Sequence, residues 1–216
     1  MSSSREAEAY GAAAGAIAVA LFVAAALVMG ERPAFDAPAA EVAAHFDENR
    51  TRIQVQCALI ALSAPFWVWF LATVAPPVGR AGAVAFGCGL TFLALFLVDV
   101  TTLAVGALRP ENMAASPELA VTLRDVEFLL MGMAAFVVAG MLLAFAALPI
   151  WPRWLARLAV LAAGAYALRL GTLFTTDGPF AADGVLGLYV PAGAFASWIF
   201  LASVVRAYAA SRAPLS

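Results

Sequence analysis

The chain has 216 residues, of which 64% are hydrophobic and only 12% are charged, and its formal net charge is −2. Soluble domains carry about 25% charged residues, and no polar stretch of this chain, whose mean hydropathy is +0.93, is long enough to cover a soluble core. The composition therefore excludes an ordinary soluble domain, and the absence of a basic tail argues against a nucleic-acid partner. It predicts an integral membrane protein whose apolar exterior is covered by the lipid bilayer.

Six segments are long and apolar enough to cross a bilayer, since a helical span needs about 20 mainly apolar residues. They cover residues 10–30, 53–75, 83–108, 126–148, 154–174 and 190–209. The first run is longer than the apolar core of a signal peptide, so we expect a retained span. The sequence thus predicts an all-α, polytopic transmembrane helix bundle of about six spans, with residues 1–216 forming a single transmembrane domain.

Charge in the connecting segments indicates the orientation of the bundle. The short connections after the second and fourth spans contain Arg80 and Arg153 but no acid, whereas acidic residues gather in the alternate connections. The positive-inside rule assigns short basic loops to the cytoplasm. Because an even number of spans returns the chain to the same side, we predict that both termini are cytoplasmic and that the protein lies in the cell inner (plasma) membrane.

The connection after the first span contains a predicted short helix at residues 37–50. Asp36 can cap this helix, and Pro38 suits its first turn. Val42 and Phe46 are four residues apart and share one helical face. We expect the helix to lie on the outer membrane surface and to lead into the second span.

A second helix-start pattern precedes the fourth span. Ser116 can act as the N-cap, Pro117 suits the first helical position, and Glu118 adds an acid to the first turn. A helix over residues 117–148 would be about 48 Å long at a rise of 1.5 Å per residue, which exceeds a hydrocarbon core of about 30 Å. We expect its first turns to protrude, to tilt or to pack over the bundle.

Two ionisable residues lie inside predicted spans, where such groups are costly and usually face partners or a cavity. From the helical rise, Asp99 lies about 24 Å along the third span and Arg169 about 22 Å along the fifth, each counted from the inner end. Opposite charges at a similar depth predict a salt bridge or a shared polar pocket. Thr102, three residues after Asp99, lies on the same helical face.

Further polar residues lie at the same level in two other spans. Arg124 and Glu127 form an i,i+3 pair, and Asp125 points about 100° away toward another neighbour. The candidate ligand-binding cluster in the outer third is therefore Asp99, Thr102, Arg124, Asp125, Glu127, Arg169, Gln54 and Gln56. Two interpretations stay open: the groups pair with one another and fix helix packing, or they line an outward-facing polar cavity.

Two patterns predict packing of individual spans. Gly11 and Gly15 form a G-x-x-x-G motif, which we interpret as tight packing within the bundle more readily than as a dimer interface. Pro65 is expected to kink the second span. Cys57 and Cys88 are expected near opposite faces of the membrane and therefore as free thiols.

The chain offers few residues for metal or cofactor chemistry. His45 is the single histidine, which excludes a bis-histidine haem and a histidine-rich metal site. No P-loop, dinucleotide-binding pattern or intramembrane Ser/His/acid set is present. We expect no metal and no cofactor, and no catalytic residue can be named.

Several local sequences carry a resemblance to a known group. They are Phe35-Asp-Ala-Pro-Ala-Ala-Glu-Val-Ala-Ala-His-Phe-Asp-Glu-Asn-Arg50, Trp69-Phe-Leu71, Val84-Ala-Phe-Gly87 and Trp151-Pro-Arg-Trp154. Over most of its length the chain resembles small six-span integral membrane proteins of actinobacteria, a group of hypothetical proteins without an assigned activity. The resemblance implies the six-span architecture and a bacterial origin, and it carries no functional residues.

Three functions are compatible with these patterns. The first is binding or transport of a small molecule or lipid in a polar outer pocket near Asp99, Arg169 and Glu127. The second is an accessory or scaffolding role, with a membrane-protein partner or a second copy of the chain on a flat apolar face. The third is an intramembrane enzyme acting on an apolar substrate, with Asp99, Asp125 or Glu127 as acid or base.

Overall fold

The computed structural model describes residues 2–75, 79–175 and 178–212, and every regular element in these residues is a helix. The elements are α1 (Ser2–Met29), α2 (Ala39–Glu48), α3 (Arg50–Val74), α4 (Gly79–Leu108), α5 (Pro110–Ala115), α6 (Pro117–Ala146), α7 (Arg153–Arg169), a 3₁₀ turn η1 (Leu170–Leu173), a π turn η2 (Val185–Tyr189) and α8 (Val190–Arg212). Six of these helices are long and apolar enough to cross a membrane: α1, α3, α4, α6, α7 with η1, and α8 with η2. The predicted all-α, six-span bundle is confirmed.

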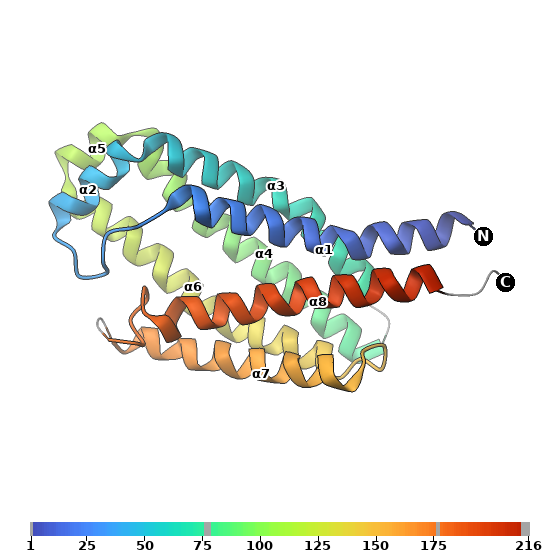
Figure 1. Ribbon diagram of the computed structural model, residues 1–216. Coiled ribbons are helices and arrows are strands. Elements are labelled where there is room, and N and C mark those ends of the chain that lie inside the picture. The colour runs from blue at the N-terminus through green and yellow to red at the C-terminus, as the bar shows by residue number, and fades with distance from the viewer. Residues whose placement is uncertain (1, 76–78, 176–177, 213–216) are drawn as a thin grey trace.

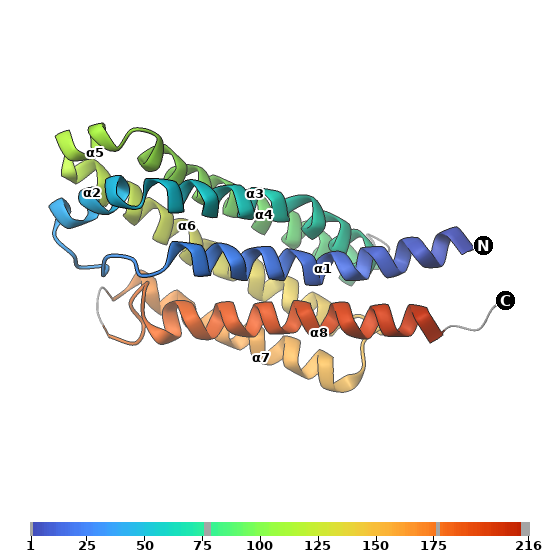
Figure 2. The same cartoon turned by 45° about the horizontal axis from the view of Figure 1, so that its top comes forward.

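The six long helices form a closed ring. In the order α1, α3, α4, α6, α7 and α8 each helix packs against the next, and α8 packs against α1. Figures 1 and 2 show α1 and α8 side by side from two directions. Helix α1 begins and α8 ends at one end of the bundle, the terminal end, and α2 and α5 lie at the opposite end, the α2 end (Figure 1).

Several helices extend past the apolar runs that predict them. Helix α3 begins at Arg50 instead of residue 53, α4 at Gly79 instead of residue 83, and α6 at Pro117, well before residue 126. Backbone hydrogen bonding continues into polar residues at the membrane surface, whereas hydropathy marks only the part that lipid must cover. Helix α6 does start after Ser116, as predicted, although the Ser116 side chain makes no capping hydrogen bond.

Helix α2 is shorter than the predicted segment 37–50, and its start differs from the prediction. Its N-cap is Pro38, whose carbonyl accepts from the N–H groups of Glu41 and Val42, and Asp36 makes no capping contact. With Asp36 as its N-cap, the helix would begin at residue 37. The backbone of Pro38 is extended, so the helix begins two residues later, at Ala39. Val42 and Phe46 share a buried face, as predicted.

Close packing of α1 against its two neighbours depends on glycine. A Cβ atom added at Gly11 would overlap the side chain of Thr73 on α3. One added at Gly15 would overlap Phe70 on α3 and Ser203 on α8. Both glycines of the G-x-x-x-G motif therefore lie at helix contacts inside the bundle, as the sequence indicates.

Apolar side chains fill the terminal half of the ring. Trp198 packs against Phe145 with ring centroids 4.7 Å apart, and it donates a hydrogen bond of 3.0 Å to the carbonyl of Leu155. Trp151, from the α6–α7 connection, packs edge-on against both rings. At the other end, Phe46 of α2 lies directly on Gly106 of α4 and docks the short helix onto the bundle.

Candidate functional site

A cavity of about 570 Å³ lies inside the ring. All six long helices contribute to its lining, for example through Ala26, Gln56, Asp99, Glu127, Arg169 and Phe195. Pockets for small molecules usually have volumes of about 300–1,000 Å³. The cavity is therefore large enough for a small organic ligand.

One wall of the cavity is aromatic. The ring of Phe195 lies 5.5 Å from that of Trp67, 5.5 Å from that of Phe92 and 5.7 Å from that of Tyr166, between centroids. All four side chains line the cavity, and they belong to the same apolar cluster that fills the terminal half of the bundle. This aromatic cluster therefore forms the end of the cavity that points toward the middle of the bundle.

The polar lining lies toward the α2 end. On α3, Gln56 is roughly 16 Å nearer that end than Trp67, and on α4, Asp99 is roughly 10 Å nearer than Phe92, from the helical rise. The same order holds on α7, where Arg169 follows Tyr166. The cavity is therefore amphipathic along its length, polar under the α2 end and apolar at its deeper end.

Two buried ionisable side chains in the polar part each have an atom that no described residue contacts through a hydrogen bond. Asp99 is 4% exposed and Arg169 is 7% exposed, and both line the cavity. Among the residues that the structure describes, Asp99 Oδ1, Arg169 Nε and Gln56 Oε1 have no hydrogen-bond partner. No ion pair within 4.0 Å joins Asp99 to Arg169 in this part of the chain, so of the two predicted arrangements, a salt bridge or a shared pocket, the structure has the shared cavity.

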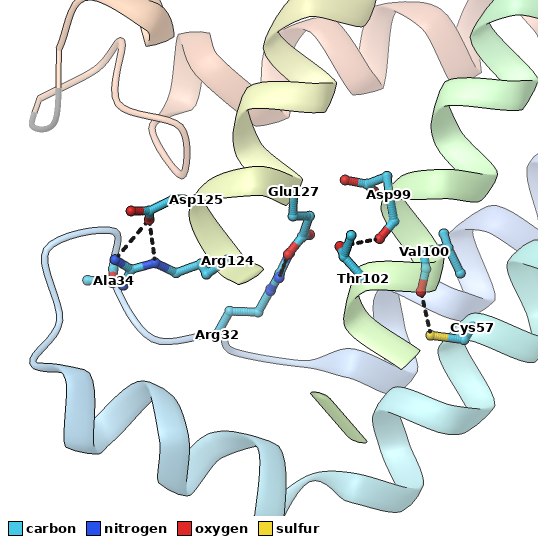
Figure 3. A network of polar contacts seen from close by, with 9 residues as sticks. All are labelled: Arg32, Ala34, Cys57, Asp99, Val100, Thr102, Arg124, Asp125 and Glu127. Atoms are coloured by element: carbon cyan, nitrogen blue, oxygen red, sulfur yellow. Dashed lines mark hydrogen bonds and ion pairs between the residues drawn. The ribbon is translucent and has the colours of Figure 1, made fainter. Parts of the chain in front are cut away.

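Glu127 pairs with an arginine from a distant loop. Arg32 Nη1 and Nη2 donate to the two carboxylate oxygens of Glu127 at 2.7 and 2.5 Å, a bidentate contact (Figure 3). The Arg32 guanidinium also lies 5.6 Å from the centre of the Phe128 ring. Within the described residues, the i,i+3 spacing of Arg124 and Glu127 produces no ion pair between them, because Arg32 approaches Glu127 from the loop and satisfies both carboxylate oxygens.

Arg124 and Asp125 face that loop and not the cavity. Arg124 donates from Nε and Nη2 to Asp125 Oδ1, both at 3.3 Å, and from Nη1 to the carbonyl of Ala34 at 3.2 Å (Figure 3). The Asp125 side chain is 44% exposed. Arg124 thus holds the loop from α6 and Asp125 holds the Arg124 side chain, and neither residue lines the 570 Å³ cavity.

We call residues 30–38, the connection between α1 and α2, the strap. Gly30 has φ +67° and turns the chain out of α1, and residues 30–34 line the cavity. From α6, Phe128 packs edge-on against Phe35 of the strap. From the α7–α8 connection, Asp183 Oδ2 accepts a hydrogen bond of 3.0 Å from the Phe35 N–H. The strap thus runs across the α2 end of the cavity and is tied to both α6 and the α7–α8 connection.

The structure brings together four of the eight candidate residues predicted from the sequence. Asp99, Glu127, Arg169 and Gln56 line the cavity. Thr102, Gln54, Arg124 and Asp125 do not line it, and Thr102 instead donates to the backbone carbonyl of Asp99 at 2.7 Å.

Three charged lining residues lie outside the predicted cluster. They are Glu31 and Arg32 of the strap and Asp183 of the α7–α8 connection. Loop residues carry no helical periodicity, so the sequence held no signal that would have placed these side chains over the bundle.

Metal-binding groups are not gathered at the cavity. Within the described parts of the chain, no three His, Cys, Asp or Glu side chains are placed to hold a metal ion. Cys57 and Cys88 are both free thiols. Comparison of the chain with protein-family models, curated proteins and solved structures finds no match. The function is therefore inferred from the cavity itself.

Proposed function

We propose that this membrane protein binds a small amphipathic molecule in the cavity at the α2 end of its helix ring. The observation that carries the proposal is the presence of buried Asp99 and Arg169 in one cavity, each with a side-chain atom for which the described part of the chain supplies no hydrogen-bond partner. An unpaired buried charge is strongly destabilising, and well-packed apolar residues would stabilise the bundle better. The presence of these two side chains is therefore better explained by contacts with a ligand than by a contribution to the stability of the bundle.

The contrast with Glu127 supports this interpretation. Where a buried carboxylate only holds elements together, as Glu127 does with Arg32, it is paired in bidentate geometry. Asp99 and Arg169 face the same cavity without such pairing. Their arrangement suits a molecule that enters the cavity and leaves it again.

The direction of access follows from the proposed topology. We place the protein in the plasma membrane of a bacterial cell with both termini in the cytoplasm, on the basis of the basic connections at Arg80 and Arg153 and of the resemblance to actinobacterial proteins. The α2 end then faces outward. Because aromatic and aliphatic side chains fill the terminal half, the cavity ends blind, which favours binding from the outer side over conduction. The accessory-subunit and intramembrane-enzyme hypotheses stay predictions.

A cavity-filling substitution tests the proposal. Ala134 on α6 is 1% exposed and lines the cavity, whereas Met133, its neighbour, points outward to lipid. We expect native mass spectrometry of protein released from lipid nanodiscs to show a bound small amphiphile on the wild type and on Met133→Phe but not on Ala134→Phe. Thermal melting of each variant checks that it is folded. Equal adducts on all three proteins, or none on the wild type, would rule the proposal out.

A further inference from the structure

The two unpartnered charges restrict the chemistry of the ligand, if the proposed binding function holds. Asp99 requires a cationic or hydrogen-bond-donating group, and Arg169 requires an anionic or accepting one. A purely cationic ligand would leave Arg169 without a partner, and a purely anionic ligand would leave Asp99 without one. A single molecule that carries both charges satisfies both side chains.

Neighbouring residues indicate which cationic group and which anionic group the ligand carries. Gln56 Oε1 is an unpartnered acceptor on α3, next to α4, which carries Asp99. A primary ammonium has three donors and can use both acceptors. Of the two arginines that line the cavity, Arg32 is already paired with Glu127, so Arg169 is the one left for an anion. Its planar guanidinium matches a phosphate or a carboxylate.

The polarity of the cavity lining indicates where the apolar part of the ligand lies. The polar groups lie under the α2 end, and the aromatic cluster with Trp67 and Phe92 lies roughly 10–16 Å deeper, from the helical rise. A lipid in the leaflet on the α2 side has this polarity, with its headgroup at the surface and its chain toward the bilayer centre. The lining would therefore accept such a molecule without turning it over.

We infer that the ligand is a single-chain amphiphile with a zwitterionic headgroup. Its ammonium group contacts Asp99, its phosphate or carboxylate contacts Arg169, and its chain lies against the aromatic cluster.

The test uses probes that share a twelve-carbon chain and differ in headgroup charge. They are dodecylphosphoethanolamine, dodecylamine and dodecyl phosphate, each also prepared with bromine at the chain end, and phosphoethanolamine serves as the chainless headgroup. Binding is measured on the full-length protein in nanodiscs at equal probe mole fractions. Bromine quenches nearby tryptophan, so quenching that is lost in Trp67→Phe reports a chain end at the aromatic cluster. Circular dichroism and thermal melting show that each variant is folded.

We expect dodecylphosphoethanolamine to bind the wild type about tenfold or more tightly than dodecylamine or dodecyl phosphate, each of which carries charge of one sign only, because each charged hydrogen bond that it adds is strong. Asp99→Asn should remove its advantage over dodecyl phosphate, and Arg169→Gln should remove its advantage over dodecylamine. The control is Glu118→Gln, an exposed acid at the start of α6 that does not line the cavity, and it should bind like the wild type.

The outcomes separate the two proposals. If all three chained probes bind equally well and quench Trp67, the cavity binds amphiphiles and the zwitterion inference is wrong. Chainless phosphoethanolamine binding as tightly as the chained form would also overturn it, because the aromatic cluster would then contribute nothing. If no chained probe quenches Trp67, the proposed function itself fails.

Discussion

Replacing Arg32 with glutamine removes the guanidinium that donates two hydrogen bonds to Glu127. Breaking a buried ion pair costs about 3–5 kcal/mol when the remaining charge stays buried. The side chain of Glu127 is 7% exposed but that of Arg32 is 30% exposed, so solvent screening reduces the expected loss to about 2 kcal/mol. In a chain of this size, each kcal/mol of lost stability lowers the Tm by about 2–4 °C, so we expect a decrease in Tm of about 4–8 °C.

The two single variants should differ. Glu127→Gln leaves Arg32 unpaired, but Arg32 can turn toward water, so its loss of stability should be smaller than that of Arg32→Gln. The double variant should recover part of the loss, because no charge is then left buried. Thermal melting in detergent, followed by tryptophan fluorescence, measures all three proteins. The reasoning is refuted if Arg32→Gln melts like the wild type, or if the double variant is less stable than both single ones.

Three further changes test the packing of α1, the docking of α2 and the charge state of His45. Gly15→Ala should lower the Tm, because overpacking a close helix contact costs about 1–3 kcal/mol. Gly106→Leu should displace Phe46 and release α2, which hydrogen exchange of residues 39–48 would detect as faster exchange. Burial, together with the nearby Arg32, lowers the pKa of His45 against the opposing effect of Glu127. As the pH falls below about 6.5, the unfolded state therefore takes up this proton first, so stability should fall, and His45→Gln should reduce the Tm difference between pH 7.5 and 5.5.

Each of these tests has its own control or contradicting result. Gly164 is a helical glycine at which an added Cβ would meet no neighbouring atom, so Gly164→Ala should leave the Tm unchanged or raise it. An equal loss in Gly15→Ala and Gly164→Ala would mean that the close contact of α1 is unimportant. Unchanged exchange over residues 39–48 in Gly106→Leu would show that Phe46 does not hold α2. An identical pH dependence in wild type and His45→Gln would remove the assigned role of His45.

Depth along the bundle could be predicted from the sequence, but the direction of side chains around it could not. The rise of a helix is constant, so counting residues places Asp99 and Arg169 at one level, and both line one cavity. The partner of Glu127 was missed because Arg32 lies 95 positions away in a loop, where no periodicity indicates a contact. A helix start could be predicted where the sequence carries a start signal, as Ser116 and Pro117 do for α6. Helices α3 and α4 begin before their apolar runs, because hydrogen bonding, not hydropathy, ends a helix.

The closed ring has a consequence for biosynthesis. Among the six long helices, α1 is made first and α8 last, yet they are neighbours, so the ring closes only after α8 has been inserted. Until then Asp99 and Arg169 do not face an enclosed cavity. Charged side chains that are exposed to lipid have a high free-energy cost. A nascent chain that stalls before α8 therefore displays unshielded charge within the bilayer, the kind of feature by which membrane quality-control proteases could distinguish an unfinished molecule from a finished one.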